Sequence, residues 1–304
     1  MALTLVESSK LHRGDVVRSA VIEMFAQQSD ILAAMPFEDI PGGILKYELE
    51  GTLPGVAFRG VNEGFTESTG VLNPQSDATY IVGGDIDVDK YIVATRGEAQ
   101  RAVHSRMKIK AIADAWAQKF IKGDNTSDPR EFDGLQTRLT GNQKIANGST
   151  SGGDPVSMKK LDNLIDAVDN PTHLIMNKSE RTNIKAYLRT SNMIAEVEDA
   201  FGRKLTTYGG LPILCTQNGA TEALPFTEAN PGGGSSVGTS IYCVSFGTNM
   251  LQGIQNGAMQ VRDLGEIPTA PLLRLRVEWY SGIALLHGRC AARLWGITNA
   301  TATA

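Results

Sequence analysis

The feature that most constrains the fold is the segment 44–95, where two stretches of β character flank a polar, glycine-rich stretch. Residues Ile44–Glu50 partly alternate between apolar and polar side chains, and strand character returns at Thr79–Val82 and over 86–93. Between them, Thr52–Gly70 offers few apolar residues and cannot form a core of its own. With ~20 residues per leg at ~3.3 Å each, such a hairpin reaches on the order of 60 Å. An arm of that reach is a liability unless a partner receives it.

A helix is predicted before this arm, over residues 8–35. Ser8 or Ser9 can cap its start, and Pro36 and the Pro41–Gly43 turn end it. Its apolar residues recur at helical spacing: Val17, Val21, Met24, Phe25, Ile31 and Leu32.

The clearest helix of the chain is predicted over 97–122, with Gly123 as its C-terminal cap. Its apolar stripe consists of Ala99, Val103, Ile109, Ala113, Trp116 and Phe120. From Arg96 to Lys122 there are seven basic and two acidic residues, so the helix is locally cationic. Six or so scattered charges give only weak, salt-sensitive contact with nucleic acid, which favours a solvated face, or pairing with acidic loops of the same fold, over a DNA contact.

The second half of the chain alternates short helices and strands and ends in β structure. Helices are predicted over Ser157–Val168 and Ser179–Leu188, and strands over Leu174–Met176, Leu211–Cys215 and Ile241–Phe246. From 273 to 280 apolar side chains alternate with polar ones, and strand character continues through 283–286 and 291–297.

Composition excludes several classes of protein. A net charge of −4 argues against a dedicated nucleic-acid binder. The three cysteines, Cys215, Cys243 and Cys290, stand far apart among apolar residues and are interpreted as reduced core residues. The first ten residues lack the pattern of a signal peptide, and no apolar stretch reaches membrane-spanning length, so we expect synthesis and folding in cytoplasm.

Motifs of catalysis and metal binding are absent. There is no phosphate-binding loop, no GxSxG elbow and no HExxH, and the four histidines are scattered. No catalytic residue, cofactor or metal site is therefore predicted. The run Asp85, Asp87 and Asp89 resembles half of a calcium loop, but Arg96 stands where the bidentate glutamate belongs. On a strand the three aspartates share one solvated face, while Ile86 and Val88 face the core.

The order of the elements resembles the tailed-phage major capsid fold, an α+β fold shared with encapsulins. A leading helix, a long hairpin and a basic spine helix are followed by a Phe132–Leu135 turn, a small α/β unit and long terminal strands. The stretch Thr52–Glu63 looks like the extended loop of phage major capsid proteins, and Leu273–Ile297 looks like their long peripheral strand and last strand.

The resemblance implies a division of the chain into named parts. Residues 1–41 are an N-terminal arm, 42–84 the extended loop and 85–149 a peripheral domain that holds the spine helix. Residues 150–271 are the axial domain, 272–289 the peripheral long strand, and 290–304 the last strand returning to the axial domain, with a tail.

The resemblance also implies a structural protein, a virion capsid subunit that assembles in host cytoplasm into an icosahedral shell of pentamers and hexamers around double-stranded DNA. Since there is no room for a fused scaffolding segment before Ser8, the resemblance implies either a separate scaffolding protein or a numbered chain that begins after processing. A portal and decoration proteins are further implied partners. Contacts between subunits are expected at Leu53, Pro54, Phe58, Arg59, Glu63 and Phe65. Contacts with DNA phosphates on the inner face are expected at Arg101, Lys108 and Lys119.

Two alternatives stay open. One is an encapsulin-type compartment with the same fold, which gene neighbourhood separates from a phage. The other is a hydrolase using a carboxylate pair such as Glu48 and Glu50, although the sequence offers no converging polar groups for such a site.

Overall fold

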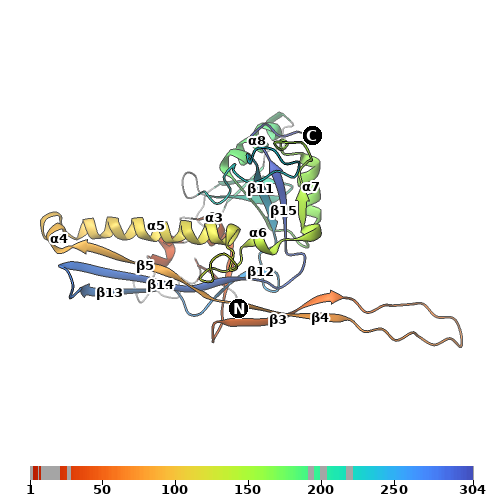
Figure 1. Ribbon diagram of the computed structural model, residues 1–304, viewed down its shortest axis with the longest axis horizontal. Coiled ribbons are helices and arrows are strands. Elements are labelled where there is room, and N and C mark those ends of the chain that lie inside the picture. Colours follow the sequence, from red (N-terminus) through yellow and green to blue (C-terminus); the bar gives the residue numbers. More distant parts are fainter. Residues whose placement is uncertain are drawn as a thin grey trace.

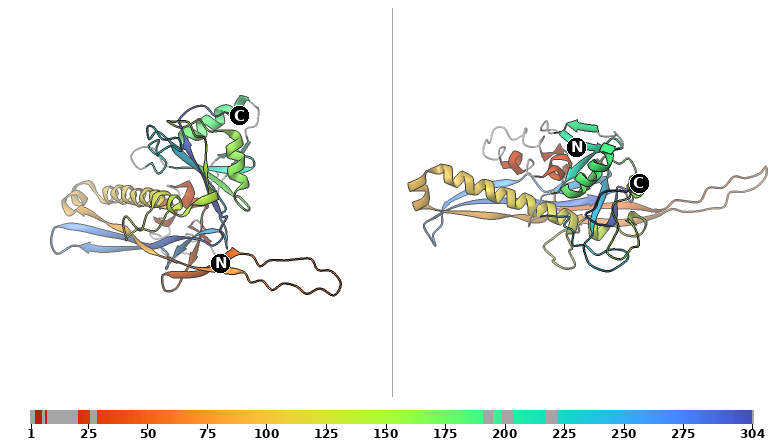
Figure 2. Two further views of the ribbon diagram at one scale, coloured as in Figure 1. Left: turned by 45° about the vertical axis from the view of Figure 1, so that its right-hand side comes forward. Right: turned by 90° about the horizontal axis from the view of Figure 1, so that it is seen from above.

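The computed structural model describes residues 3–5, 7, 21–25, 29–190, 195–198, 204–216 and 222–303. Three units are arranged around the helix α5: a six-stranded sheet beneath it, a seven-stranded sheet with two helices above one end of it, and a two-stranded arm (Figure 1). The arm extends well beyond the rest of the molecule, as the view from above makes plain (Figure 2). The predicted α+β architecture is confirmed.

The six-stranded sheet is built on one long strand, β14. One edge of β14 pairs with β5 along ten residues, and the other edge pairs with β13 and then β12. The order is β1-β2-β12-β14-β13, with β5 also on β14. Its strands are β1 (Leu3–Thr4), β2 (Pro36–Asp39), β5 (Tyr80–Asp89), β12 (Leu251–Gln255), β13 (Gln260–Glu266) and β14 (Leu272–Leu285).

Helix α5 (Glu98–Lys122) covers this sheet and buries the larger of the two main cores. Trp116 is 1% exposed and lies 5.9 Å from Trp279 of β14 and 5.6 Å from Phe120, measured between ring centroids. Its indole N–H donates to the Ser281 hydroxyl at 3.0 Å. The predicted stripe is confirmed at Ile109, Ala113, Trp116 and Phe120, but Val103 is 47% exposed and does not belong to it.

The seven-stranded sheet has the order β6-β15-β11-β7-β10-β9-β8 and mixes parallel and antiparallel pairs. Strand β11 is buried at every position, because β15 and β7 pair with its two edges and its alternate side chains belong to the two main cores. Helices α7 and α8 pack their apolar sides on the second core. The strands are β6 (Lys144–Ala146), β7 (His173–Met176), β8 (Ala195–Glu198), β9 (Lys204–Tyr208), β10 (Leu211–Cys215), β11 (Thr239–Val244) and β15 (Ala291–Ile297), and the helices are α7 (Met158–Asp166) and α8 (Lys178–Thr190).

The arm consists of β3 (Ile44–Thr52) and β4 (Val71–Ala78), paired antiparallel. The returning leg was predicted too late in the chain, at Thr79–Val82. Thr79 lies between β4 and β5, and Tyr80–Val82 belong to β5 in the large sheet. Strand β4 contains Pro74 and is solvent-exposed over its first six residues, so it shows none of the alternation by which a half-buried strand is found.

Two further predictions need correction. The residues Tyr91, Ile92 and Val93 are helical, in α4 (Lys90–Arg96), because the Asp89 carboxylate accepts from the Tyr91 N–H at 2.7 Å and caps a helix there. The leading helix is not continuous through 35: residues 21–25 are helical and α3 (Asp30–Ala34) follows an extended Ser29. Its predicted caps Ser8 and Ser9 lie outside the described residues. Short elements complete the chain: α6 (Leu135–Arg138) and the 3-10 turn Gly141–Gln143.

Candidate subunit interface

The tip of the arm carries the predicted contact residues, and all six are exposed. Phe58 is as exposed as in an open peptide at 106%, Leu53 is 73% exposed and Phe65 70%. Two apolar side chains that the sequence analysis had not chosen join them, Val56 at 93% and Val61 at 92%. The tip is thus richer in apolar surface than expected. Val56 and Val61 each directly follow a glycine, and this local pattern could have identified them from the sequence.

The tip has local order of its own. The Arg59 guanidinium lies over the Phe65 ring, 5.2 Å from its centroid, and donates to the Glu63 carbonyl at 3.0 Å. The Glu63 carboxylate accepts from the Gly60 N–H at 2.8 Å. These contacts bring Arg59, Glu63 and Phe65 together, and they hold the turn in shape while its apolar side chains point into solvent.

The cationic residues of α5 fall into different environments. The Lys119 ammonium pairs with Glu131, and Lys122 lies 3.6 Å from a Glu228 carboxylate oxygen. Lys108 is half-buried. The side chain of Arg101 lies outside the described part of the structure. Of the predicted phosphate contacts, Lys119 is therefore already engaged with a carboxylate of its own chain.

The aspartates of β5 alternate with Ile86 and Val88 along the strand, and two of them, Asp85 and Asp87, are paired with arginines of β14. Arg276 donates through two nitrogens to Asp85, at 2.7 and 2.9 Å, and Arg274 does the same to Asp87, at 2.7 and 2.6 Å. These hydrogen bonds lower the pKa of both carboxyls. Ile86 and Val88 are buried as predicted. The face is solvent-accessible, as predicted, and it also carries ion pairs between β5 and β14 that the sequence analysis had not predicted.

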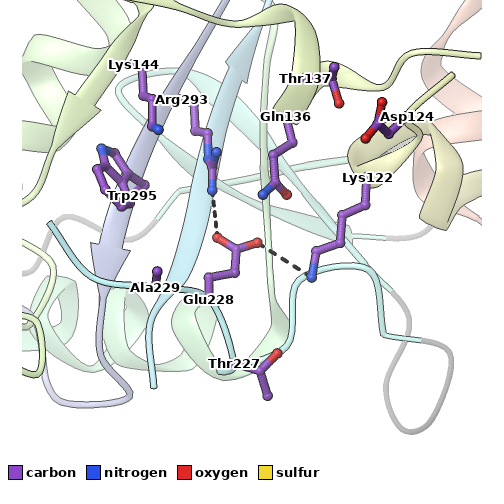
Figure 3. A pocket seen from close by; sticks show the side chains of 10 residues that line it. All are labelled: Lys122, Asp124, Gln136, Thr137, Lys144, Thr227, Glu228, Ala229, Arg293 and Trp295. Atoms are coloured by element: carbon purple, nitrogen blue, oxygen red, sulfur yellow. Dashed lines mark hydrogen bonds and ion pairs between the residues drawn. The ribbon is translucent and has the colours of Figure 1, made fainter. Parts of the chain in front are cut away.

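A polar cavity of about 500 Å³ lies where the end of α5 meets the seven-stranded sheet (Figure 3). Inside it the Arg293 guanidinium donates to Glu228 at 2.9 Å and to the Ser240 hydroxyl at 3.0 Å, and both charged side chains are almost fully buried. Lys122 approaches the same carboxylate from α5, and the Lys144 ammonium lies 4.3 Å from the centroid of the Trp295 ring. The charges of Lys122, Glu228 and Arg293 therefore connect the C-terminal end of α5 to β15 of the seven-stranded sheet.

The cysteines and the acidic residues considered as reactive groups all lie in the described part of the chain. Cys215, Cys243 and Cys290 are buried free thiols, as predicted, and burial raises the pKa of each. Over the described ranges, no group of three or more potential ligand residues is arranged to hold a metal ion. Glu48 and Glu50 are exposed on the arm. No described helix combines the length and apolar character needed to cross a membrane.

Comparison with known proteins gives one family match. Residues 13–158 match the model of the family described as Major capsid protein GP7. This range spans α3, the arm, α5 and the loops after it. No curated protein sequence matches the chain.

Comparison with solved structures identifies the fold. The encapsulin of the holo-SrpI complex from Synechococcus elongatus PCC 7942 is 17% identical, with a TM-score of 0.65 over 90% of this chain and 89% of that one. A chain in the structure of Mycobacterium phage Bobi is 14% identical, with a TM-score of 0.60 over 91% of both chains. The capsid of an empty GTA particle, also 14% identical, gives 0.60 over 89% and 90%. At these identities the shared property is the fold, which covers nearly the whole chain.

Proposed function

We propose that this chain is a major capsid protein and that its copies close into the icosahedral shell of a tailed phage. The family match over residues 13–158 and the fold support this proposal. Pentamers and hexamers are the building units, and double-stranded DNA is the content. The role is structural, without catalysis, and the mature location is the virion after assembly in host cytoplasm.

One observation carries this proposal: the arm projects from the body with an apolar tip. Monomeric proteins rarely expose large contiguous apolar patches, and such patches mark interaction sites. The tip side chains make their described hydrogen bonds within the tip, so the arm leaves its apolar side chains for a neighbour. Leu53, Pro54, Phe58, Arg59, Glu63 and Phe65 are the proposed contact residues, with Val56 and Val61 added from the structure.

The DNA contact is proposed as weak and unspecific. A net charge of −4 on the subunit opposes attraction of a genome, so packaging needs a force supplied by other proteins. Arg101, Lys108 and Lys119 remain the proposed contacts with phosphate, although Lys119 would first have to leave Glu131. A separate scaffolding protein, a portal and decoration proteins are the further proposed partners.

The experiment that tests the proposal is sedimentation of the purified chain over a wide concentration range, with scaffold supplied. Formation of large closed particles supports it. A single monomer boundary at every concentration would refute it.

An encapsulin-type compartment is the second candidate, supported by the TM-score of 0.65 to the encapsulin structure. The match to a major capsid family favours the phage function. The contents of particles purified from the native source separate the two: packaged DNA indicates a phage capsid, and an enclosed enzyme indicates an encapsulin.

A further inference from the structure

The arm joins the body at Thr79, the residue between β4 and β5, and we call this junction the root of the arm. Strand β4 ends at Ala78 and β5 begins at Tyr80, so one almost continuous strand passes from the arm into the large sheet. Before Thr79 it pairs with β3, and after Thr79 it pairs with β14. Thr79 itself donates its N–H to the Gly43 carbonyl at 2.8 Å, which closes the base of the hairpin.

A carboxylate just before this junction is held from two sides. Asp77, only 8% exposed, accepts from the Tyr47 hydroxyl at 2.8 Å with one oxygen and lies 2.7 Å from the Arg138 guanidinium with the other. Tyr47 belongs to β3, Asp77 to β4 and Arg138 to α6 of the body. One side chain of the arm therefore connects both arm strands to the body.

The guanidinium of Arg138 is fixed in turn. Its Nε donates to the Asp133 carbonyl at 2.8 Å, in the loop that precedes α6. Burial lowers the pKa of Arg138, but the hydrogen bond and charge of Asp77 outweigh this, and the pKa is raised overall. Burial, followed by the charge of Asp77, raises the pKa of Tyr47. The arginine stays charged and the phenol stays protonated at physiological pH, so neither group changes its role as a donor.

The same loop holds the strand just after the junction. The Asn125 side-chain amide donates to the Tyr80 hydroxyl at 2.7 Å and to the Glu131 carbonyl at 2.9 Å. The Asn125 N–H donates to the Asp133 carboxylate at 2.8 Å. The body segment 125–138 thus grips the strand on both sides of Thr79.

We propose that Asp77, through Tyr47 and Arg138, is the positioning residue that sets the angle at which the arm leaves the body. This inference rests on the proposed function in one respect: in a shell, the arm has to reach a neighbouring subunit at a fixed angle. Without the ion pair, the backbone pairing of β3 and β4 is kept, but the arm swings about Thr79. Subunits then fold and fail to close shells.

The test measures the arm angle directly, by spin-label distance measurement on the full chain. Labels go on cysteines introduced at Thr66 in the tip and Lys159 on α7, both exposed, while the three natural thiols are buried. Labelled chains are diluted with unlabelled ones so that only distances within a subunit are seen. The expected result is a narrow distribution for the otherwise unchanged chain and a clearly broader one for Asp77→Asn and Arg138→Gln.

The matched control is Glu266→Gln, which breaks an exposed ion pair to Lys90 at 2.8 Å away from the root and leaves the distribution narrow. If Asp77→Asn does not fold, Tyr47→Phe removes a single hydroxyl and should still broaden the distribution. If the folded variants Asp77→Asn, Arg138→Gln and Tyr47→Phe gave distance distributions as narrow as that of the unchanged chain, the proposal would be overturned. Because the measurement needs no shell, that outcome is distinct from a failure of the capsid function.

Discussion

Replacing Trp116 by alanine should remove a large part of the stability of the subunit. The indole is 1% exposed and lies among Phe37, Phe120, Phe132 and Trp279, with centroids 5.6 to 5.9 Å away. Truncating a buried tryptophan costs about 3–5 kcal/mol. The lost hydrogen bond to Ser281, which leaves that hydroxyl buried, adds roughly 1 kcal/mol. Against a typical total of about 5–15 kcal/mol, the loss is decisive.

The assay is guanidinium unfolding followed by circular dichroism, with the free energy extrapolated to water. Lys110→Ala is the matched control, an exposed side chain on the same helix that should change the free energy of unfolding by no more than about 0.5 kcal/mol. A loss below about 1 kcal/mol for Trp116→Ala, less than most buried truncations cost, would refute the account of how α5 packs on the sheet.

Four further results are expected. Deleting Leu53–Gly70 should leave a folded subunit by circular dichroism and abolish particles by sedimentation, because the tip contributes nothing to either main core. Arg293→Leu should cost about 3 kcal/mol in denaturant unfolding, since the buried Glu228 carboxylate loses its guanidinium partner and keeps only the Ser240 hydroxyl and Lys122 at 3.6 Å. Burial raises the pKa of Glu180 to about 7, so the folded state holds a proton that the unfolded state has lost. Its contribution to the free energy of unfolding therefore falls as pH rises from about 4.5 to about 7, by up to about 3 kcal/mol, and Glu180→Gln should flatten that dependence in unfolding at several pH values. Filter binding of free subunits to unrelated duplexes should be weak and vanish as salt rises, and tight, sequence-dependent binding at physiological salt would contradict the charge argument.

Helices and strands with one buried and one solvent-exposed face were predicted well from the sequence. Helix α5 was found because Ile109, Ala113, Trp116 and Phe120 repeat at helical spacing, and β14 because apolar side chains alternate along it. Val103 fits the same spacing and is 47% exposed, so helical spacing alone does not identify which turns of a helix are buried.

Pairing between distant strands was beyond the sequence. Residues Thr79–Val82 have strand character, but nothing local says that Tyr80–Asp89 pairs with β14, about two hundred positions later, and not with β3. The ion pairs of Asp85 with Arg276 and of Asp87 with Arg274 follow from that register, and for the same reason they could not be foreseen.

At the candidate site too, residues that form a local sequence pattern were predicted, and contacts between distant segments were not. The tip was identified from a local pattern, and the six residues chosen there are exposed. The group of Tyr47, Asp77 and Arg138 went unnoticed because its members lie in three elements and none stands in a motif. The predicted division into an arm, extended loop, peripheral domain and axial domain stays a proposal.

Electron microscopy of the purified chain, produced with a scaffolding protein, tests the central claim most directly. The account predicts closed icosahedral shells in which the arm of each subunit, with Phe58 at its tip, is buried against a neighbour. Monodisperse single subunits at every protein concentration, or shells in which the arm projects freely into solvent, would contradict it.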